Sequence, residues 1–455
     1  MPARCHSFIE QKTTAAKRPI GFAPVLAAGL LLASANSAFA VPVTARKADA
    51  FVDSIGVNLH LGYDNPGNPY GNFEMVKTRL REMGIRHTRD SFEGPSYKQW
   101  IKDRHNDLGR SGIKGTFIVD GSRLTPIQNL EAADLMPDAV EAFEGQNEIL
   151  NIYVKWDDAK RDAARKYQQD VFAAVKASPK WRNTPVLGPT CVGNDAYQAL
   201  GDLSAWMDYG NAHSYPLGPA PAVPKSGFFN ELKGAQIVAP GKQIFVTETG
   251  YTTGTRDDGN QRVSMAAAAK YAPRLYLENF NRGMLRSYWY ELADQGTDGS
   301  QESTFGLVTQ THAYKPQGTA IRNLTTLLKD ASFDGKTRKW VSPKPAFVPQ
   351  KLDYTLTGAT TNVHSTLLQK SNGKFYLCLW QEIDSYNIDN NVEADIVNPD
   401  ASVVLNLKTP IASAVSYKPT ASTTSSALTL SKNRINLSVP DQVLIVELTP
   451  KTIAK

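Results

Sequence analysis

Two glutamates follow separate apolar segments of the chain and could act together on one substrate. Glu148 ends the stretch 144–148 (EGQNE), and Glu248 ends the stretch 243–248 (QIFVTE). Two carboxyl groups about 5–5.5 Å apart can cleave a glycosidic bond with retention of configuration, because one attacks the anomeric carbon while the other protonates the leaving oxygen and then activates water. The pair therefore suggests glycosidic bond chemistry.

Further polar and aromatic residues lie at the ends of other apolar segments and are candidates for the same site. Each also has a structural alternative: the glutamates as surface acids, the arginine as an ion pair, the tryptophan as a core residue. Glu144 would face the same way as Glu148 along an extended strand, and we expect it to be a buried partner of Arg89 or His87. The additional candidates are Arg89, Asn147, His213, Tyr215 and Trp289.

Eight short apolar runs alternate with amphipathic helices between about residues 50 and 330. This alternation, over a length typical of the fold, predicts a (β/α)8 barrel, in which catalytic groups project from the carboxyl ends of the strands. An open doubly wound sheet is the alternative, but no G-x-G-x-x-G or phosphate-binding loop supports a nucleotide site. The expected strands cover residues 54–60, 85–90, 114–119, 139–147, 185–188, 209–213, 243–248 and 286–290.

The pattern changes after about residue 345 to short β-rich runs. Two of them flank Asn372-Gly373, a dipeptide typical of a two-residue hairpin turn. We expect the barrel to cover residues 45–335 and a small all-β sandwich to cover 345–455. The sandwich is expected to pack on the barrel as a support, and its Asn- and Asp-rich stretch 384–400 to be a solvated loop.

Residues 1–40 have the features of a cleaved secretory signal. Basic residues precede the apolar stretch 20–35, and the small residues of 37–40 (SAFA) follow it. The apolar run is shorter than the ~20 residues that a membrane span requires. We expect cleavage after Ala40, a secreted or periplasmic protein, and no membrane span in the mature chain.

The composition is that of a globular protein, with 41% hydrophobic and 21% charged residues and a formal net charge of +6 over 455 residues. Charges of one sign form no long run, so a nucleic-acid-binding role, which usually shows a basic stripe, is not supported. No His/Cys cluster accompanies His213, and we expect neither a metal nor a cofactor. Cys191 and Cys378 lie far apart in the sequence and are expected to be buried free thiols. A monomer is expected.

The order of these candidates resembles clan A of the retaining glycoside hydrolases over roughly residues 50–330. That clan has a (β/α)8 barrel, its acid/base is the Glu of an Asn-Glu pair after strand four, and its nucleophile is a Glu ending strand seven. A small sandwich after the barrel is common among its xylosidase-like and glycanase members. The motifs that carry the resemblance are Asn147-Glu148, His213-x-Tyr215, Glu248 and Trp289.

The resemblance implies a role for each residue. Glu148 would be the acid/base and Glu248 the nucleophile of a double displacement on a polysaccharide or oligosaccharide, with β-linkages the habit of most of the clan. One departure is Ile149, where clan members often have proline, and it loosens the assignment to any single family. The remaining residues would bind substrate or hold the nucleophile: Asn147 on the sugar 2-hydroxyl, Tyr215 or His213 on the nucleophile, Arg89 beneath it, and Trp289 as the sugar platform.

Other functions stay open at this stage. A non-catalytic carbohydrate-binding protein on the same barrel predicts the loss of one carboxylate, and both are present. A transglycosylase would use the same residues. A Ser-His-Asp esterase is disfavoured because no G-x-S-x-G motif occurs. The sugar, its linkage and the choice between internal and terminal cleavage are not predicted.

Overall fold

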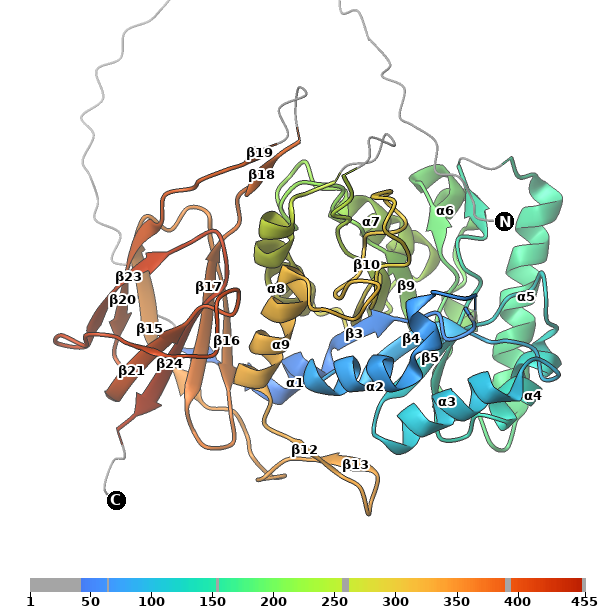
Figure 1. Ribbon diagram of the computed structural model, residues 1–455, viewed down its shortest axis with the longest axis horizontal. Coiled ribbons are helices and arrows are strands. Elements are labelled where there is room, and N and C mark those ends of the chain that lie inside the picture. The colour runs from blue at the N-terminus through green and yellow to red at the C-terminus, as the bar shows by residue number, and fades with distance from the viewer. Residues whose placement is uncertain (1–41, 64, 153–154, 256–261, 389–393, 452–455) are drawn as a thin grey trace, which may run out of the picture.

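The computed structural model describes residues 42–455, apart from 64, 153–154, 256–261, 389–393 and 452–455. The predicted signal at residues 1–40 lies outside the described residues. Figure 1 shows two parts side by side, a helix-rich part and an all-β part, with α8 (Met265–Asn281) and α9 (Pro316–Leu328) between them.

None of the helices described is both long and apolar enough to cross a lipid bilayer.

A parallel sheet forms the barrel. Seven strands are hydrogen-bonded in the order β6-β5-β4-β3-β11-β10-β9. Residues 185–188 fill the eighth position through two parallel bridges, one from Val186 to Phe143 and one from Leu187 to Tyr209. The predicted (β/α)8 barrel is therefore confirmed. Its strands are β3 (Ile55–Asn58), β4 (His87–Ser91), β5 (Lys114–Ile118), β6 (Val140–Glu144), β9 (Gly210–His213), β10 (Ile244–Thr249) and β11 (Ser287–Trp289).

Helices follow each strand position, and α1 (Ala48–Asp53) precedes the first strand. The predicted first helix is confirmed: α2 begins after Asn72, whose side chain caps it, and its buried residues include Val76 and Leu80. The helices that follow the first six strand positions are α2 (Phe73–Glu82), α3 (Gln99–Arg110), α4 (Pro126–Asp134), α5 (Asp158–Ala177), α6 (Asn194–Leu200) and α7 (Phe228–Val238).

Alternation along the strands decides which residues enter the barrel. On β6, Phe143 packs in a cluster with residues of α5, whereas Ala142 packs with Phe245 and Tyr288 of other strands. Because side chains alternate between the two faces of a strand, Glu144 points to the same side as Ala142. The last residue of β6 is thus directed into the barrel.

Two sheets, antiparallel except for the parallel pairing of β2 with β16, form the sandwich. Their facing sides bury one continuous apolar cluster, which includes Leu377, Leu405 and Ile435. The predicted hairpin around Asn372-Gly373 is present, but its connection is longer than two residues, because the last strand pair is Gln369 with Phe375. The sheets are β15 (Tyr354–Gly358), β20 (Ala401–Leu407) and β23 (Arg434–Val439); and β2 (Arg46–Lys47), β16 (Val363–Gln369), β17 (Phe375–Gln381), β24 (Leu444–Pro450), β21 (Ile411–Tyr417) and β22 (Ser426–Ala427).

Several short strands depart from the predicted organisation. β2 pairs with β16, and β1 (Val43–Thr44) pairs with β14 (Lys351–Leu352), so the start of the described chain joins the all-β part. The expected linker contains a hairpin, β12 (Ser332–Asp334) and β13 (Lys339–Val341), which docks on the barrel through a bond from the Trp340 indole to the Gly112 carbonyl at 2.9 Å. Two-residue strands are too short to show a period in the sequence. Two further pairs consist only of two-residue strands: β7 (Leu150–Asn151) with β8 (Cys191–Val192), and β18 (Tyr386–Asn387) with β19 (Ala394–Asp395).

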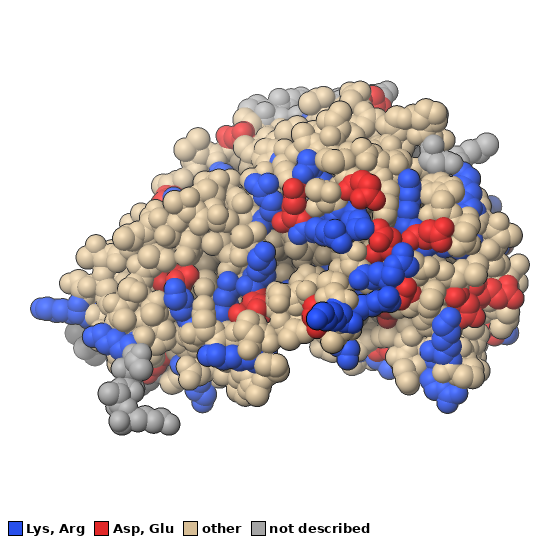
Figure 2. Space-filling model, turned by 60° about the horizontal axis from the view of Figure 1, so that its bottom comes forward, with Lys and Arg blue, Asp and Glu red and all other residues tan. Residues whose placement is uncertain are grey.

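Charged side chains mix on the face drawn in Figure 2, where basic and acidic groups lie beside each other. The ion pairs of the barrel include Arg79–Glu82 within α2 and Arg110 of α3 with Asp138, which lies between α4 and β6. Cys191 and Cys378 are both buried free thiols, as predicted.

Candidate active site

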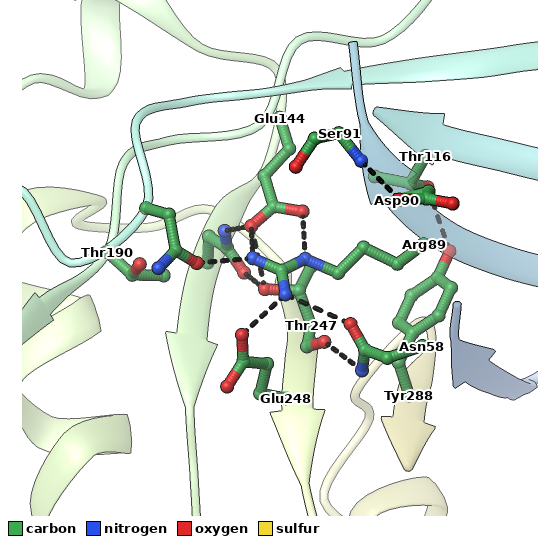
Figure 3. A network of polar contacts seen from close by, with 12 residues as sticks. Asn58, Arg89, Asp90, Ser91, Thr116, Glu144, Thr190, Thr247, Glu248 and Tyr288 are labelled. Carbon is green, nitrogen blue, oxygen red and sulfur yellow. Dashed lines mark hydrogen bonds and ion pairs between the residues drawn. The ribbon is translucent and has the colours of Figure 1, made fainter. Parts of the chain in front are cut away.

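Arg89 lies at the centre of a polar network at the carboxyl end of the barrel strands (Figure 3). Its guanidinium donates to both oxygens of Glu144, at 2.7 and 2.8 Å, and to Glu248 at 2.5 Å. It also donates to the Oδ1 atoms of Asn58 at 3.0 Å and of Asn147 at 2.6 Å. One buried cation therefore connects residues from four strand ends.

Glu144, whose side chain has no exposed surface, is a buried partner of Arg89, one of the two partners predicted for it. Its Oε1 also accepts from the Asn211 amide and the Thr247 hydroxyl, both at 3.0 Å. Burial alone would raise the pKa of Glu144, but Arg89 and His213 outweigh it and lower the pKa to about 2. Glu144 is thus a fixed negative charge that orients Arg89.

Glu248 reaches the network because β10 is irregular. Val246 pairs with Ala212 and Glu248 with the next residue, His213, so β10 contains one extra residue there. Such a bulge redirects side chains, and it lets the adjacent residues Thr247 and Glu248 both join the network. The hydroxyl of Tyr215 donates to Glu248 Oε2 at 2.8 Å.

The environment keeps Glu248 ionised. Burial disfavours its charge, but His213 and Arg89, together with the bond from Tyr215, lower its pKa below the ordinary value. Its side chain is 13% exposed, against 33% for Glu148. Glu248 is therefore held as an anion in a mostly buried position.

Glu148 lies just beyond β6 on a backbone with φ of 45°, in the left-handed region that a residue with a side chain rarely adopts. Strain of this kind costs about 1–3 kcal/mol and is concentrated at functional sites. The Glu148 N–H donates to the Thr190 hydroxyl at 2.9 Å. A carboxylate oxygen of Glu148 lies within 4.8 Å of one of Glu248.

His213 lies between the two carboxylates. Its Nδ1 is 3.0 Å from Glu148 Oε1 and 3.5 Å from Glu248 Oε2, while its Nε2 is 3.3 Å from Arg89 Nη2. Burial disfavours the charged imidazole, but Glu248, Glu144 and Glu148 outweigh this effect and raise the pKa of His213 to about 9. The proton on Nδ1 can thus be donated in a hydrogen bond to either Glu148 or Glu248.

Glu148, His213 and Glu248 each present an atom that could bind a metal ion. The Arg89 guanidinium already contacts two of these three residues, and its positive charge disfavours a second cation at the same place. The donor set suits acid–base and nucleophilic chemistry better than metal binding.

The structure corrects the expectation for Trp289, which has no exposed surface that a sugar could contact. Its ring packs 6.2 Å from that of Tyr251, and its indole N–H donates to the Phe305 carbonyl at 2.8 Å. The next residue, Tyr290, is partly exposed, with its ring 5.6 Å from that of His60. Because side chains alternate in direction along the strand, Tyr290 rather than Trp289 points to the mouth of the barrel.

The first strand contributes residues that the sequence reading did not single out. Asn58 contacts Arg89, and His60, at the end of the same predicted strand, stacks on Tyr63 with centroids 4.6 Å apart. His60 also lies 3.4 Å from Glu291, which follows β11. The signal was available, because Asn58 and His60 are polar residues two apart at the end of a predicted strand.

The remaining predicted residues gather as follows. Six of them form one connected set of contacts, and they come from β4, β6, β9 and β10 or from the residues just after these strands. The six are Arg89, Asn147, His213, Tyr215, Glu148 and Glu248. Trp289 alone among the predicted site residues lies apart from it.

No protein-family model and no curated protein sequence matches the chain. Solved structures do resemble it. A family 39 glycoside hydrolase from Bacteroides cellulosilyticus is 15% identical with a TM-score of 0.58, and the match covers 90% of this chain and 83% of that one. A 4-O-α-L-rhamnosyl-β-D-glucuronidase from Fusarium oxysporum is 12% identical with a TM-score of 0.55, over 89% and 97%.

A third similar structure is a family 51 α-L-arabinofuranosidase from Bifidobacterium longum, 11% identical with a TM-score of 0.53, over 90% of this chain and 98% of that one. At these identities the likeness concerns the fold. The chain has the fold of clan A glycoside hydrolases, a (β/α)8 barrel with a C-terminal β domain.

Proposed function

We propose that the protein is a retaining glycoside hydrolase that cleaves glycosidic bonds, β bonds by the habit of the clan, in a polysaccharide or oligosaccharide. The observation that carries this proposal is the pair Glu148 and Glu248, whose oxygens approach within 4.8 Å at the mouth of the barrel. Retaining enzymes hold their carboxyl groups about 5–5.5 Å apart, whereas inverting enzymes need about 6.5–9.5 Å to admit a water molecule.

In the first step, Glu248 attacks the anomeric carbon through a carboxylate oxygen. Glu148, in its protonated form, gives its proton to the glycosidic oxygen, so the bond to the leaving sugar breaks and that sugar departs as an alcohol. A glycosyl ester then joins the anomeric carbon to Glu248. The low pKa of Glu248 supports this assignment, because only the anion is an effective nucleophile.

In the second step, water attacks the anomeric carbon and Glu148, now a carboxylate, accepts its proton. The ester bond breaks, and Glu248 returns to the anionic form. His213 suits both steps, because its Nδ1 faces both glutamates. When Glu248 is esterified and uncharged, His213 can turn its proton fully to Glu148.

The other residues have supporting roles in this proposal. Arg89 and Tyr215 hold Glu248, Asn147 binds the sugar 2-hydroxyl, and the partly exposed Tyr290 takes the platform role first given to Trp289. The basic and apolar segment at residues 1–40 supports export of the enzyme, to the periplasm or beyond.

Paired variants test the proposal. On a panel of aryl glycosides and glycans, Glu248→Ala should lose activity by several orders of magnitude, and Glu148→Ala should lose about 10²–10⁴-fold. Azide should restore each variant: Glu248→Ala would yield a glycosyl azide of inverted configuration, and Glu148→Ala one of retained configuration. Glu131→Ala, on the exposed side of α4, is the matched control.

The outcomes separate the possible functions. Activity of Glu248→Ala equal to that of wild type would refute this nucleophile. Sugar transferred to another sugar in place of water would identify a transglycosylase on the same residues. Binding to a glycan without cleavage by wild type would point to a carbohydrate-binding protein.

A further inference from the structure

The loop after β9 is closed at its base by a bond from the Gly227 N–H to the Pro216 carbonyl at 3.0 Å and by one from the Ser226 hydroxyl to the Pro221 carbonyl at 2.9 Å. It contains prolines at 216, 219, 221 and 224, and proline has no N–H to donate. Between Pro219 and Pro224, only Ala220, Ala222 and Val223 keep a backbone N–H. The N–H groups of Ala220 and Ala222, in the middle of the loop, find their acceptors outside it.

Two carboxylates of the all-β part supply those acceptors. The Ala220 N–H donates to Asp384 Oδ1 and the Ala222 N–H to Glu382 Oε1, both at 2.8 Å. The loop residue Lys225 also pairs with Asp384 Oδ2 at 2.9 Å. Both acids follow β17, so the end of one sandwich strand binds the backbone N–H groups of alternate loop residues.

The barrel helix α8 and the sandwich together hold the Glu382 carboxylate. Glu382 Oε2 accepts from Arg274 Nε of α8 at 3.1 Å and from the Trp380 indole at 2.8 Å. Arg274 has no exposed surface, and it also donates to the carbonyls of Ile383 and Asp441, each at 3.0 Å. The anchor is therefore a rigid junction between the barrel and the sandwich, which lies beside α8 in Figure 1.

The same loop begins at the catalytic network. Tyr215, which donates to Glu248, is followed directly by Pro216. The Ser214 N–H donates to the Glu248 carbonyl at 2.8 Å, which ties the root of the loop to β10. Leu217 adopts a left-handed φ of 60° and exposes 47% of its surface at the start of the loop.

We propose that Asp384 and Glu382 are positioning residues for substrate binding. They fix the loop 216–227 against the sandwich. The loop then forms a wall of the substrate cleft that contacts the sugar units next to the cleaved bond. The sandwich is thus part of the specificity machinery of the enzyme. This inference rests on the proposed function, because it assigns a part to the sandwich in that same reaction.

Asp384→Ala tests the proposal through two independent readouts on the full-length chain. Loss of a charge-assisted bond to a buried N–H should raise KM for an oligosaccharide about tenfold, with kcat within about twofold. Hydrogen exchange measured by mass spectrometry on free protein should rise in the peptide containing Ala220 and Ala222. Asp384→Asn keeps the acceptor for Ala220 and should restore both values to within about twofold of wild type.

Two further variants make the test specific. Glu447→Ala removes a sandwich carboxylate that bonds Lys374 and Tyr417 instead of the loop, and it should leave both KM and loop exchange unchanged. Lys225→Glu places a like charge against Asp384 from the loop side, and it should raise KM and loop exchange without altering the sandwich.

Each outcome decides a stated point. Unchanged loop exchange in both Asp384→Ala and Lys225→Glu would overturn the anchoring. Raised exchange with unchanged KM would overturn the role in substrate binding. A wild-type protein that cleaves no glycoside would refute the proposed function and with it the substrate role, while hydrogen exchange would still decide whether the sandwich anchors the loop.

Discussion

Glu144 and Glu291 are both fully buried at the mouth of the barrel, yet they differ in charge. Glu144 faces the Arg89 guanidinium at 2.7 and 2.8 Å, and its pKa falls to about 2. Glu291 accepts from the Tyr70 hydroxyl at 2.7 Å and the Gln295 amide at 2.8 Å, which are neutral donors. Burial then raises the pKa of Glu291 to about 8.

The contrast shows what the catalytic network needs. Burial by itself removes the charge of a carboxyl group, and hydrogen bonds from neutral donors do not restore it. Cations keep both groups ionised here: Arg89, with His213, lowers the pKa of Glu144, and His213, with Arg89, lowers the pKa of Glu248. Arg89 is therefore one of two cations, with His213, that keep the proposed nucleophile Glu248 anionic.

Replacing Arg89 with methionine breaks this contrast and has the largest expected effect. Glu144 and Glu248 would keep only His213 as a neighbouring cation, so the pKa values of both would rise in the direction of the Glu291 pKa. We expect a loss of about 3–5 kcal/mol in the free energy of unfolding and the loss of nearly all activity. Urea unfolding and kcat/KM measure the two effects.

Arg123→Met is the matched control, because the Arg123 side chain is 70% exposed and should tolerate the change. Activity of Arg89→Met within tenfold of wild type would show that the cation is not what sustains the nucleophile.

Replacing Glu291 with glutamine tests the other half of the comparison, the buried carboxyl group whose hydrogen-bond donors are neutral. The unfolded chain releases this proton near pH 4.5, whereas the folded protein keeps it up to about pH 8. Between these values the unfolded state binds fewer protons, so the contribution of Glu291 to stability falls as pH rises. Glu144 has the opposite sign, since its contribution is present above about pH 4.5 and is lost as pH falls toward 2.

Glu291→Gln should therefore flatten the stability profile on the alkaline side. The wild type should lose on the order of 3 kcal/mol more than the variant between pH 5 and pH 8. Asp90, whose pKa burial raises to about 7, contributes equally to both proteins and cancels in the difference. Parallel profiles in urea unfolding at these two pH values would mean that Glu291 is ionised when buried.

The smallest of these effects concerns Tyr215, the neutral donor to the proposed nucleophile Glu248. Tyr215→Phe removes the 2.8 Å bond to Glu248 but leaves Arg89 in place. The pKa of Glu248 should rise, so the acidic limb of the kcat/KM profile should move to higher pH, with a loss of about tenfold in rate. Tyr97→Phe, on an exposed side chain, should leave the profile unchanged; a shift in that control, or none in Tyr215→Phe, would contradict the assignment.

The sequence predicted the barrel and most of the site because both follow from local patterns. Apolar runs of strand length, separated by helical periods, placed seven of the eight strands, and residues 185–188 fill the eighth position with isolated bridges. Glu148, Asn147 and Arg89 could be read from the ends of those runs. The alternation of side chains along β6 indicated the direction of Glu144 and left Arg89 and His87 as its possible partners, of which the structure shows Arg89.

What the sequence could not supply depends on register and on distant contacts. Tyr288, Trp289 and Tyr290 are all aromatic, so no polar alternation indicates which of them points into the barrel. The extra residue in β10 breaks strict alternation and brings Thr247 and Glu248 together. Asp384 lies in a stretch that composition describes as solvated, and its bond to Ala220 joins residues that are remote in sequence.

The configuration of the first product tests the central claim most directly. Proton NMR of a reaction with an aryl glycoside, recorded before mutarotation, reveals which anomer of the released sugar forms first. Two carboxylates within 4.8 Å of each other predict that this anomer keeps the configuration of the substrate. An inverted first product would contradict the account, because it would require a water molecule where Glu248 is proposed to attack.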